Sequence, residues 1–276
     1  MKTKLSCTII LLLVLISNPV LALEPFMRYD NFNTIFLDPD KWTGQEFTNP
    51  GLVILESSRE IDWGSLHLRS RVYGVSNPQF LNAGTRLFFT NSDEVTAIKA
   101  RVRVTGVEAK GCVGSTVSTR AVVRLAGFFF NTSHENPTGN VENDVLAYIG
   151  LQRVSDSTDK PYLLHAVAYV YHCLNSGCSN VSLIGTHDFG TISLFKATEI
   201  SIQWDKDFNQ FIFRLDRQSP VSIGYNFSYE YPSGIRNNKR IEAMNFLPSC
   251  GDGDWPVAYI DAFVDNVFVN WGALLE

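Results

Sequence analysis

Glu60 and Asp62 are the acidic pair in this sequence whose spacing most suggests catalysis. Residues two apart on a β-strand place their side chains on the same face. Two such carboxyl groups could act as nucleophile and general acid in retaining glycoside hydrolysis, which needs them about 5–5.5 Å apart. Trp63 and Gly64 follow at once and predict a turn. We therefore expect the pair to lie at a solvated strand end and not to be catalytic.

A second set of residues has the chemistry of a carbohydrate-binding surface. Aromatic rings offer flat apolar area with a polar tip, and planar polar groups exchange hydrogen bonds with sugar hydroxyls. On three predicted strands such residues share one face, opposite a purely aliphatic face. The candidate ligand-binding residues are Arg124, Tyr148, Gln152, His165, Tyr169 and Tyr171. Large residues also fill the inside of a β-sandwich, so core packing is the alternative explanation.

Other catalytic arrangements have less support in the sequence than the acidic pair. No serine lies in a Gly-x-Ser-x-Gly elbow. His187 and Asp188 could orient a general base, but Gly185 and Gly190 on either side predict a surface turn.

Three consecutive strands, 121–130, 144–153 and 163–172, must position the candidate binding residues. Each alternates at period two, and the loops 131–143 and 155–160 are rich in Asn, Ser, Asp, Gly and Pro. Similar patterns predict further strands at 65–72, 95–104, 181–184, 191–195, 199–204, 210–216 and 262–271. Residues 240–246 are expected to form a short helix at the edge.

This succession of short strands predicts an all-β fold, an antiparallel β-sandwich of jelly-roll type with at most one or two short helices. No change of composition marks a domain boundary, so residues 23–276 are expected to form one domain.

Residues 1–22 have the pattern of a secretory signal peptide. Lys2 and Lys4 precede the apolar run 9–16, which is too short to span a membrane, and Ala22 ends a cleavage motif. The mature chain is expected to be secreted or periplasmic and to have no transmembrane segment. Its net charge, already -5 with those lysines counted, argues against nucleic acid as a partner. Asn131, Asn180 and Asn226 stand in glycosylation motifs, which matter only in a host that glycosylates exported proteins.

The four cysteines beyond the signal peptide favour two disulfides in an exported protein. We expect Cys173–Cys178, which would close a short loop after a strand, and by elimination Cys112–Cys250. A zinc site is the alternative, but Cys173 and Cys178 lack the usual two-residue spacing.

The two ends of the chain carry motifs of a known superfamily. Asp30-Asn31-Phe32-Asn33, followed by Leu37-Asp38 and Lys41-Trp42, resembles the opening of secreted jelly rolls of the concanavalin A-like lectin/glucanase superfamily. Tyr259-Ile260-Asp261 and Asp265-Asn266-Val267-Phe268-Val269 are similar to its final strand, which pairs with the first. Residues 61–68 and 124–131 are similar to internal strands of such proteins.

The resemblance implies two curved sheets, often with a sugar-binding concave face, and in some members glycoside hydrolysis. The hydrolases carry a Glu-x-Asp-x-x-Glu strand, but Ser65 stands in the third acidic position here. Members often hold a structural calcium ion between the first and last strands. The matching positions for such an ion are Asp265 and the carbonyl of Gly64, with Asp30 as a helper, and the alternative is that Asp265 only caps a strand. Apart from this structural calcium option, no cofactor is expected.

These observations favour a non-catalytic, lectin-like module that binds a polysaccharide or other glycan. The alternatives are a divergent glycoside hydrolase or polysaccharide lyase of the same fold, and a structural or adhesive surface protein without a small ligand.

Overall fold

The computed structural model describes residues 25–48, 52–74, 81–133, 139–234, 238–248, 250 and 255–274. Strands make up 64% of it, and they form two antiparallel sheets packed as a sandwich. The predicted fold class is therefore confirmed. The predicted signal peptide lies outside the described residues and stays a prediction.

The first sheet has eight strands in the order β13-β12-β11-β6-β15-β4-β3, with β1 paired to β15. Its strands are β1 Phe26–Asp30, β3 Leu52–Asp62, β4 Ser65–Gly74, β6 Ala97–Lys110, β11 Thr198–Asp205, β12 Gln210–Leu215, β13 Val221–Gly224 and β15 Val257–Asn270.

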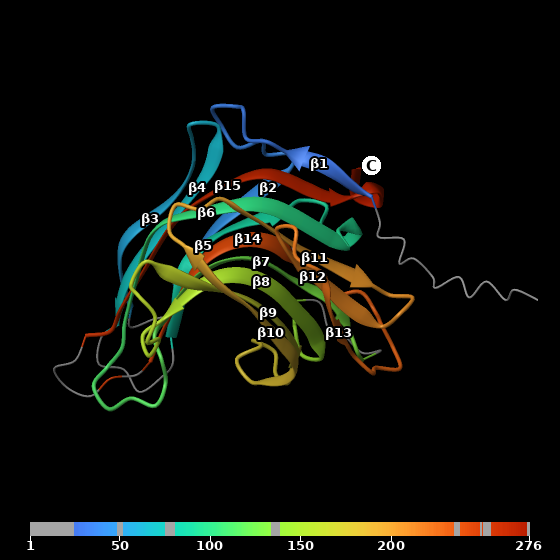
Figure 1. Cartoon of the computed structure of the whole chain (residues 1–276). Coiled ribbons are helices and arrows are strands. Elements are labelled where there is room, and N and C mark those ends of the chain that lie inside the picture. The colour runs from blue at the N-terminus through green and yellow to red at the C-terminus, as the bar shows by residue number, and fades with distance from the viewer. Residues whose placement is uncertain are drawn as a thin grey trace, which may run out of the picture.

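The second sheet has seven strands in the order β10-β9-β8-β7-β14-β5-β2. Its strands are β2 Trp42–Thr48, β5 Leu81–Phe89, β7 Arg120–Asn131, β8 Asp144–Val154, β9 Leu163–Cys173, β10 Val181–Ser193 and β14 Lys239–Leu247. Figure 1 shows these strands bending so that their hollow side faces away from the eight-stranded sheet. We call this hollow side the concave face.

The core lies between the sheets and is built by the alternation that the sequence predicts. Val145, Ala147, Ile149 and Leu151 of β8 are buried there with Leu164, Ala166, Ala168 and Val170 of β9. From the opposite sheet, Ile98, Ala100, Val102 and Val104 of β6 join them. Burying an aliphatic side chain of this size contributes roughly 1.5–3 kcal/mol, so the period-two pattern fixes which face of each strand turns inward.

The first and last strands pair in one sheet, as the terminal motifs imply. In the β1–β15 pair, Met27 lies opposite Val269, Arg28 opposite Phe268 and Asp30 opposite Val267. No helix among the described residues is long and apolar enough to cross a membrane.

The helix expected at 240–246 is wrong. These residues belong to β14, which lies in the middle of the seven-stranded sheet between β7 and β5. Ile241 and Ala243 join the core, while Arg240 and Glu242 point to the concave face and are buried there by pairing with charges on neighbouring strands. The helices that the described residues do form are two short 3-10 turns, Ser92–Glu94 and Trp271–Leu274.

The turn expected after Asp62 is confirmed. Trp63 and Gly64 both have positive φ, 50° and 71°, and join β3 to β4. Two positive φ values are typical of the type I′ hairpin turn, whose twist matches that of the flanking strands. The strand β3 before it is not among the strands that the sequence pattern predicts, because several of its apolar side chains are exposed at the edge of the sheet.

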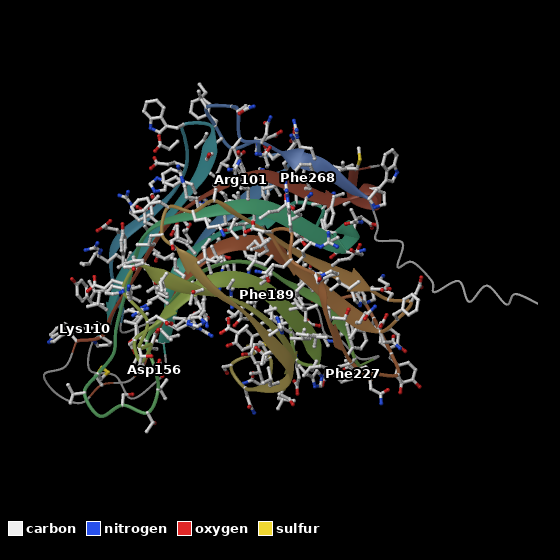
Figure 2. The ribbon with its side chains drawn as sticks, in the orientation of Figure 1. Arg101, Lys110, Asp156, Phe189, Phe227 and Phe268 are labelled. Carbon is white, nitrogen blue, oxygen red and sulfur yellow. A yellow bond between two sulfur atoms is a disulfide. The ribbon has the colours of Figure 1, made fainter. Side chains whose placement is uncertain are left out.

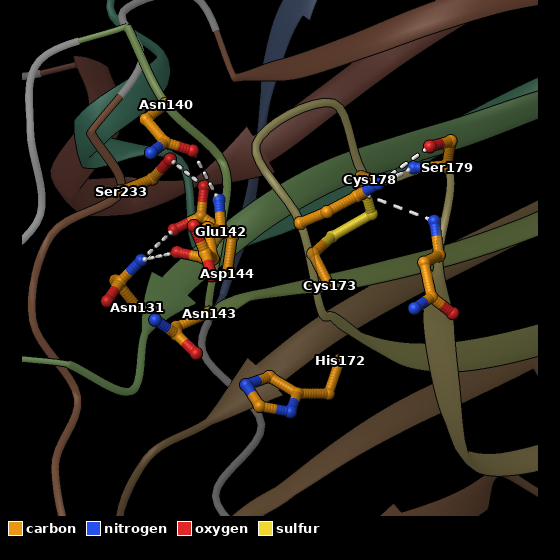
Figure 3. The surroundings of a disulfide bond; sticks show 12 residues. Asn131, Asn140, Glu142, Asn143, Asp144, His172, Cys173, Cys178, Ser179 and Ser233 are labelled. Carbon is orange, nitrogen blue, oxygen red and sulfur yellow. Dashed lines mark hydrogen bonds between the residues drawn. A yellow bond between two sulfur atoms is a disulfide. The ribbon is translucent and has the colours of Figure 1, made fainter.

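Both predicted disulfides are present. Cys173–Cys178 closes the short loop after β9, and Cys112–Cys250 joins residues 138 positions apart. Figure 3 shows the first of them beside a network of polar side chains around Asn131 and Asp144. Asn131 is fully buried, and its amide donates hydrogen bonds to Asp144 and to the carbonyl of Glu142. It therefore cannot carry a glycan in this fold, whereas Asn180 and Asn226 are exposed.

Candidate functional site

The six candidate binding residues all come to the concave face. In the strand register, Tyr148 lies opposite Tyr169, and Gln152 lies opposite His165. Arg124 lies opposite Gly150 on β8. Because directly opposite residues on one face of an antiparallel pair are in contact range, the set forms one continuous surface over β7, β8 and β9.

Three tyrosines form an aromatic strip on this surface. The ring centres of Tyr148 and Tyr169 are 5.2 Å apart, and those of Tyr169 and Tyr171 are 5.5 Å apart with planes only 7° from parallel. Tyr148 is buried, with 2% of its surface exposed, while Tyr169 and Tyr171 are half-buried. Tyr148 is therefore as buried as a core residue, although it lies on the concave face. The rings of Tyr169 and Tyr171 remain partly accessible.

Arg124 is held against Tyr148 by its neighbours. Its guanidinium lies 4.3 Å from the centre of the Tyr148 ring, a cation–π contact. Its Nε donates a 2.6 Å hydrogen bond to Glu242 Oε1. A Cβ atom at Gly150 would lie 2.6 Å from the Cβ of Arg124, so glycine at this position makes room for the arginine side chain.

Glu242 is fully buried at the centre of the concave face and is shared by three arginines. Arg86 and Arg240 donate to its Oε2 from Nε at 3.0 and 2.8 Å, and Arg124 donates to Oε1. Burial raises the pKa of Glu242, but the charges of Arg124, Arg240 and Arg86 outweigh it and lower the pKa overall. Glu242 therefore stays ionised and is unsuited to act as a general acid.

An open cleft of about 780 Å³ lies over β8, β9 and β10 and is closed on one side by the loop between β8 and β9. Gln152, His165 and Tyr169 line it together with Asp156 of the loop, which Figure 2 labels. Three of the six candidate residues thus line a space large enough for a sugar chain. A volume of this size is typical of ligand clefts.

His165 connects the loop to β10. Its Nε2 lies 2.6 Å from Asp159 Oδ2 and its Nδ1 lies 2.7 Å from Asp188 Oδ2. Burial lowers the pKa of His165, but the hydrogen bonds with Asp159 and Asp188 raise it overall. The ring of His165 therefore bridges two carboxylates, and these contacts favour its charged form. Asp188 lies in β10 and not in the isolated turn expected from its flanking glycines.

Gln152 is the candidate residue whose hydrogen bonds are least complete. Only 7% of its surface is exposed, and its Oε1 has no hydrogen-bond partner in the described part of the protein. A buried polar atom without a partner costs about 1–3 kcal/mol. Because Gln152 lines the cleft, its side chain is placed to exchange hydrogen bonds with a ligand.

The acidic pair Glu60 and Asp62 lies elsewhere. Both residues belong to β3 at the edge of the eight-stranded sheet, whereas the cleft lies on the seven-stranded sheet. The side chain of Glu60 is 62% exposed and lies 3.6 Å from His67 Nδ1. This position agrees with the solvated strand end that the sequence predicts for the pair.

Calcium between the first and last strands stays a prediction. Asp30 accepts hydrogen bonds from the indole of Trp42 and the backbone of Phe32, and Asp265 accepts two from Asn266. No group of three or more His, Cys, Asp or Glu side chains within the described ranges could hold a metal ion.

Calcium binding there predicts a higher melting temperature in excess Ca²⁺ than in EDTA. Asp265→Asn should abolish that difference, and Asp207→Asn, in the distant β11–β12 turn, should leave it unchanged. Equal melting temperatures in Ca²⁺ and EDTA would contradict the predicted calcium site.

The residues that sequence reasoning missed are Glu242, Arg86, Arg240, Arg120 and Asp159. The first three form the charged centre, and Arg120 Nη1 reaches the Tyr148 hydroxyl at 3.4 Å. Alternation of charged and apolar residues over 240–243 could have indicated a strand, and with it an outward Arg240 and Glu242.

No family model matches the chain, and no curated protein matches it. Among solved structures it aligns with a laminarinase from Flavobacterium sp. UMI-01, at 12% identity and a TM-score of 0.41, over 87% of this chain and 97% of the other. An endo-β-galactosidase from Clostridium perfringens aligns at 10% identity and a TM-score of 0.42, over 89% of this chain and 64% of the other. The carbohydrate-binding module CBM66 from Bacillus subtilis aligns at 11% identity and a TM-score of 0.32, over 79% of this chain and 93% of the other.

The fold implied by the terminal motifs, a sandwich of two antiparallel sheets, is the one observed here. Similarities of this degree carry no argument about activity. What the protein does must be inferred from its own concave face.

Proposed function

We propose that the protein is an exported glycan-binding module that holds a sugar chain in the cleft on its concave face. The observation that carries the proposal is the composition of that cleft. The ring of Tyr169 offers a stacking surface, the unpartnered Oε1 of Gln152 accepts a hydrogen bond, and the carboxylates beside His165 accept others. A flat ring beside several hydrogen-bonding groups suits the apolar faces and hydroxyls of a sugar.

The charge states on the concave face favour binding without cleavage. Retaining hydrolysis needs a nucleophile and a general acid whose pKa is raised. Glu242 has a lowered pKa, and hydrogen bonds with His165 lower the pKa of Asp159. Both nitrogens of His165 are engaged by carboxylates, so the ring has no free lone pair with which to act as a base.

Two disulfides support export to an oxidising compartment. Together with the predicted signal peptide, they are the basis for placing the protein in the periplasm or outside the cell. A glycan partner in either place would be a polysaccharide of the surroundings or of a cell surface.

A glycan array with the mature protein, followed by calorimetry on the best ligands, tests the proposal. Tyr169→Ala and Gln152→Ala should each weaken binding about tenfold, since each removes a contact of about 1.4 kcal/mol. Phe208→Ala is the matched control, because Phe208 is an exposed aromatic residue, 56% accessible, in the turn between β11 and β12. Absence of binding to every glycan would favour the structural or adhesive alternative.

A further inference from the structure

The concave face carries an excess of positive charge over its central strands. Arg86, Arg120, Arg124 and Arg240 point to it from β5, β7 and β14, and Glu242 is the carboxylate that Arg86, Arg124 and Arg240 share. This excess contrasts with the net charge of the whole chain, -5. Buried charges are normally paired one to one, so an arrangement with more guanidinium groups than carboxylates needs a reason.

Arg120 is the member of this group without a carboxylate partner. It forms no ion pair with any described residue, and it is half-buried. Its guanidinium lies 4.3 Å from the centre of the Phe246 ring, and its Nη1 lies 3.4 Å from the Tyr148 hydroxyl. These contacts orient the side chain and leave its charge available to a partner from outside the chain.

The position of Arg120 places that charge next to the cleft. Arg120 and Arg124 flank Val122 on β7, and Val122 lies opposite Gln152, which lines the cleft. Tyr148, which contacts both arginines, lies opposite Tyr169, another lining residue. One arginine-rich surface therefore continues into the cleft through Tyr148 and Gln152.

The far side of the cleft has the opposite character. Asp159 and Asp188 lie there on either side of His165, and Asp156 lies on the same loop as Asp159. Carboxylates accept hydrogen bonds from hydroxyl groups but repel anions. A ligand with anionic groups would be oriented by this difference, with its charged group toward β7 and its hydroxyls toward β10.

We propose that the glycan bound here is anionic, bearing carboxylate or sulfate groups, and that Arg120 holds such a group while Arg124 adds to the positive potential behind it. This inference rests on the glycan binding proposed above and names its ligand class. A guanidinium suits the role because its planar fork matches both carboxylate and sulfate oxygens.

The test compares three oligosaccharides of equal length by calorimetry: a neutral gluco-oligosaccharide, an oligogalacturonate and a sulfated galacto-oligosaccharide. We expect at least one anionic ligand to bind tenfold or more tightly than the neutral one, and its affinity to fall as salt is raised. The two anionic ligands distinguish a carboxylate from a sulfate. Arg120→Gln should lower the affinity for the anionic ligand about tenfold and change the affinity for the neutral one by less than twofold.

Arg103→Gln is the matched control. Arg103 also stacks on an aromatic ring, Phe263 at 5.0 Å, and also lacks an ion pair with the described residues, but it lies on the exposed side of β6 in the other sheet. Arg103→Gln should change neither the affinity for the anionic ligand nor that for the neutral one. Arg120→Lys keeps the charge and should therefore lose less affinity for the anionic ligand than Arg120→Gln. Thermal melting curves check that each variant is folded.

The outcomes separate this inference from the function on which it rests. Neutral and anionic ligands bound equally well, with no effect of Arg120→Gln, would overturn the anionic assignment and leave glycan binding in place. If the protein bound none of the three oligosaccharides and no glycan on the array, both the anionic assignment and the proposed glycan binding would be overturned.

Discussion

His165 shows how one side chain can make the cleft depend on pH. Asp159 and Asp188 contact its two nitrogens, and Asp156, Tyr169 and His187 are the other titratable groups that line the same cleft. Folding raises the pKa of His165 above 6.5 and lowers that of Asp159 below 3.8. The stabilisation by the charged histidine is complete below its ordinary pKa and is lost as pH rises through the folded value. The contribution of Asp159 is present above 3.8 and is lost as pH falls further.

The first prediction concerns His165→Gln. The melting temperature of this variant should fall below that of the wild type most strongly between about pH 4.5 and 6, and the gap should narrow by pH 9. His187→Gln is the control, since His187 packs edge-on against Phe189 at 4.6 Å and forms no ion pair with the described residues. Melting curves over this pH range measure the difference. A difference in melting temperature that stays constant with pH would mean that His165 is not charged between Asp159 and Asp188.

The second prediction concerns Glu242→Gln. Removing this carboxylate leaves the guanidinium groups of Arg86, Arg124 and Arg240, of which the last two are buried, without a counter-charge. Loss of one partner of a buried ion pair costs about 3–5 kcal/mol, so urea unfolding should show a loss of at least about 3 kcal/mol. Glu60→Gln changes the same group at an exposed position and should alter the free energy of unfolding by less than about 0.5 kcal/mol. A loss below about 1 kcal/mol for Glu242→Gln would show that the arginines do not need it.

At the scale of elements, the strands that the sequence predicts best are those with one aliphatic and one polar face. β8 and β9 are such strands, and their boundaries and inward faces were predicted closely. β14 was missed because Glu242 and Arg240 look solvent-exposed in isolation. Their burial depends on Arg124 and Arg86, which are 118 and 156 residues away from Glu242 in the chain. Local periodicity carries no information about such distant partners.

The same reasoning explains which site residues were found. Tyr148, Gln152, His165 and Tyr169 share a face because alternation within two adjacent strands places them there. Arg120 lies at the first position of β7, one residue before the predicted strand, and Asp159 lies in a loop. A loop residue has no face that a period could assign, so its contact with His165 emerges only from the folded chain.

The third prediction compares the two disulfides. Cys112–Cys250 ties the start of the segment before β7 to the segment after β14 and closes 138 residues, whereas Cys173–Cys178 closes only 5. In the chain-entropy model, a longer closed loop restricts the unfolded chain more. Replacing Cys112 and Cys250 by serine should therefore lower the melting temperature more than replacing Cys173 and Cys178. Calorimetry of the two double variants decides the order, and the reverse order would point to strain or to native packing as the main effect.

At the scale of the whole molecule, the two sheets have different roles. The eight-stranded sheet joins the two ends of the chain and carries Glu60 and Asp62 at its edge. The seven-stranded sheet carries the arginine-rich centre and the cleft. The acidic pair most similar to a hydrolase motif is thus separated from the surface that suits a sugar chain.

The last prediction is that the protein binds without cutting. Incubation with a panel of neutral, carboxylated and sulfated polysaccharides should release no reducing ends above the blank, and no ultraviolet absorbance from the unsaturated ends that a lyase leaves. The double change Glu60→Gln and Asp62→Asn should leave glycan affinity within a few-fold, because both residues lie on the other sheet. Steady turnover abolished by that double change would place catalysis on β3. Turnover abolished instead by Asp159→Asn or Asp188→Asn would place it at His165, and the carboxylates that bridge this ring would then be acting on the substrate.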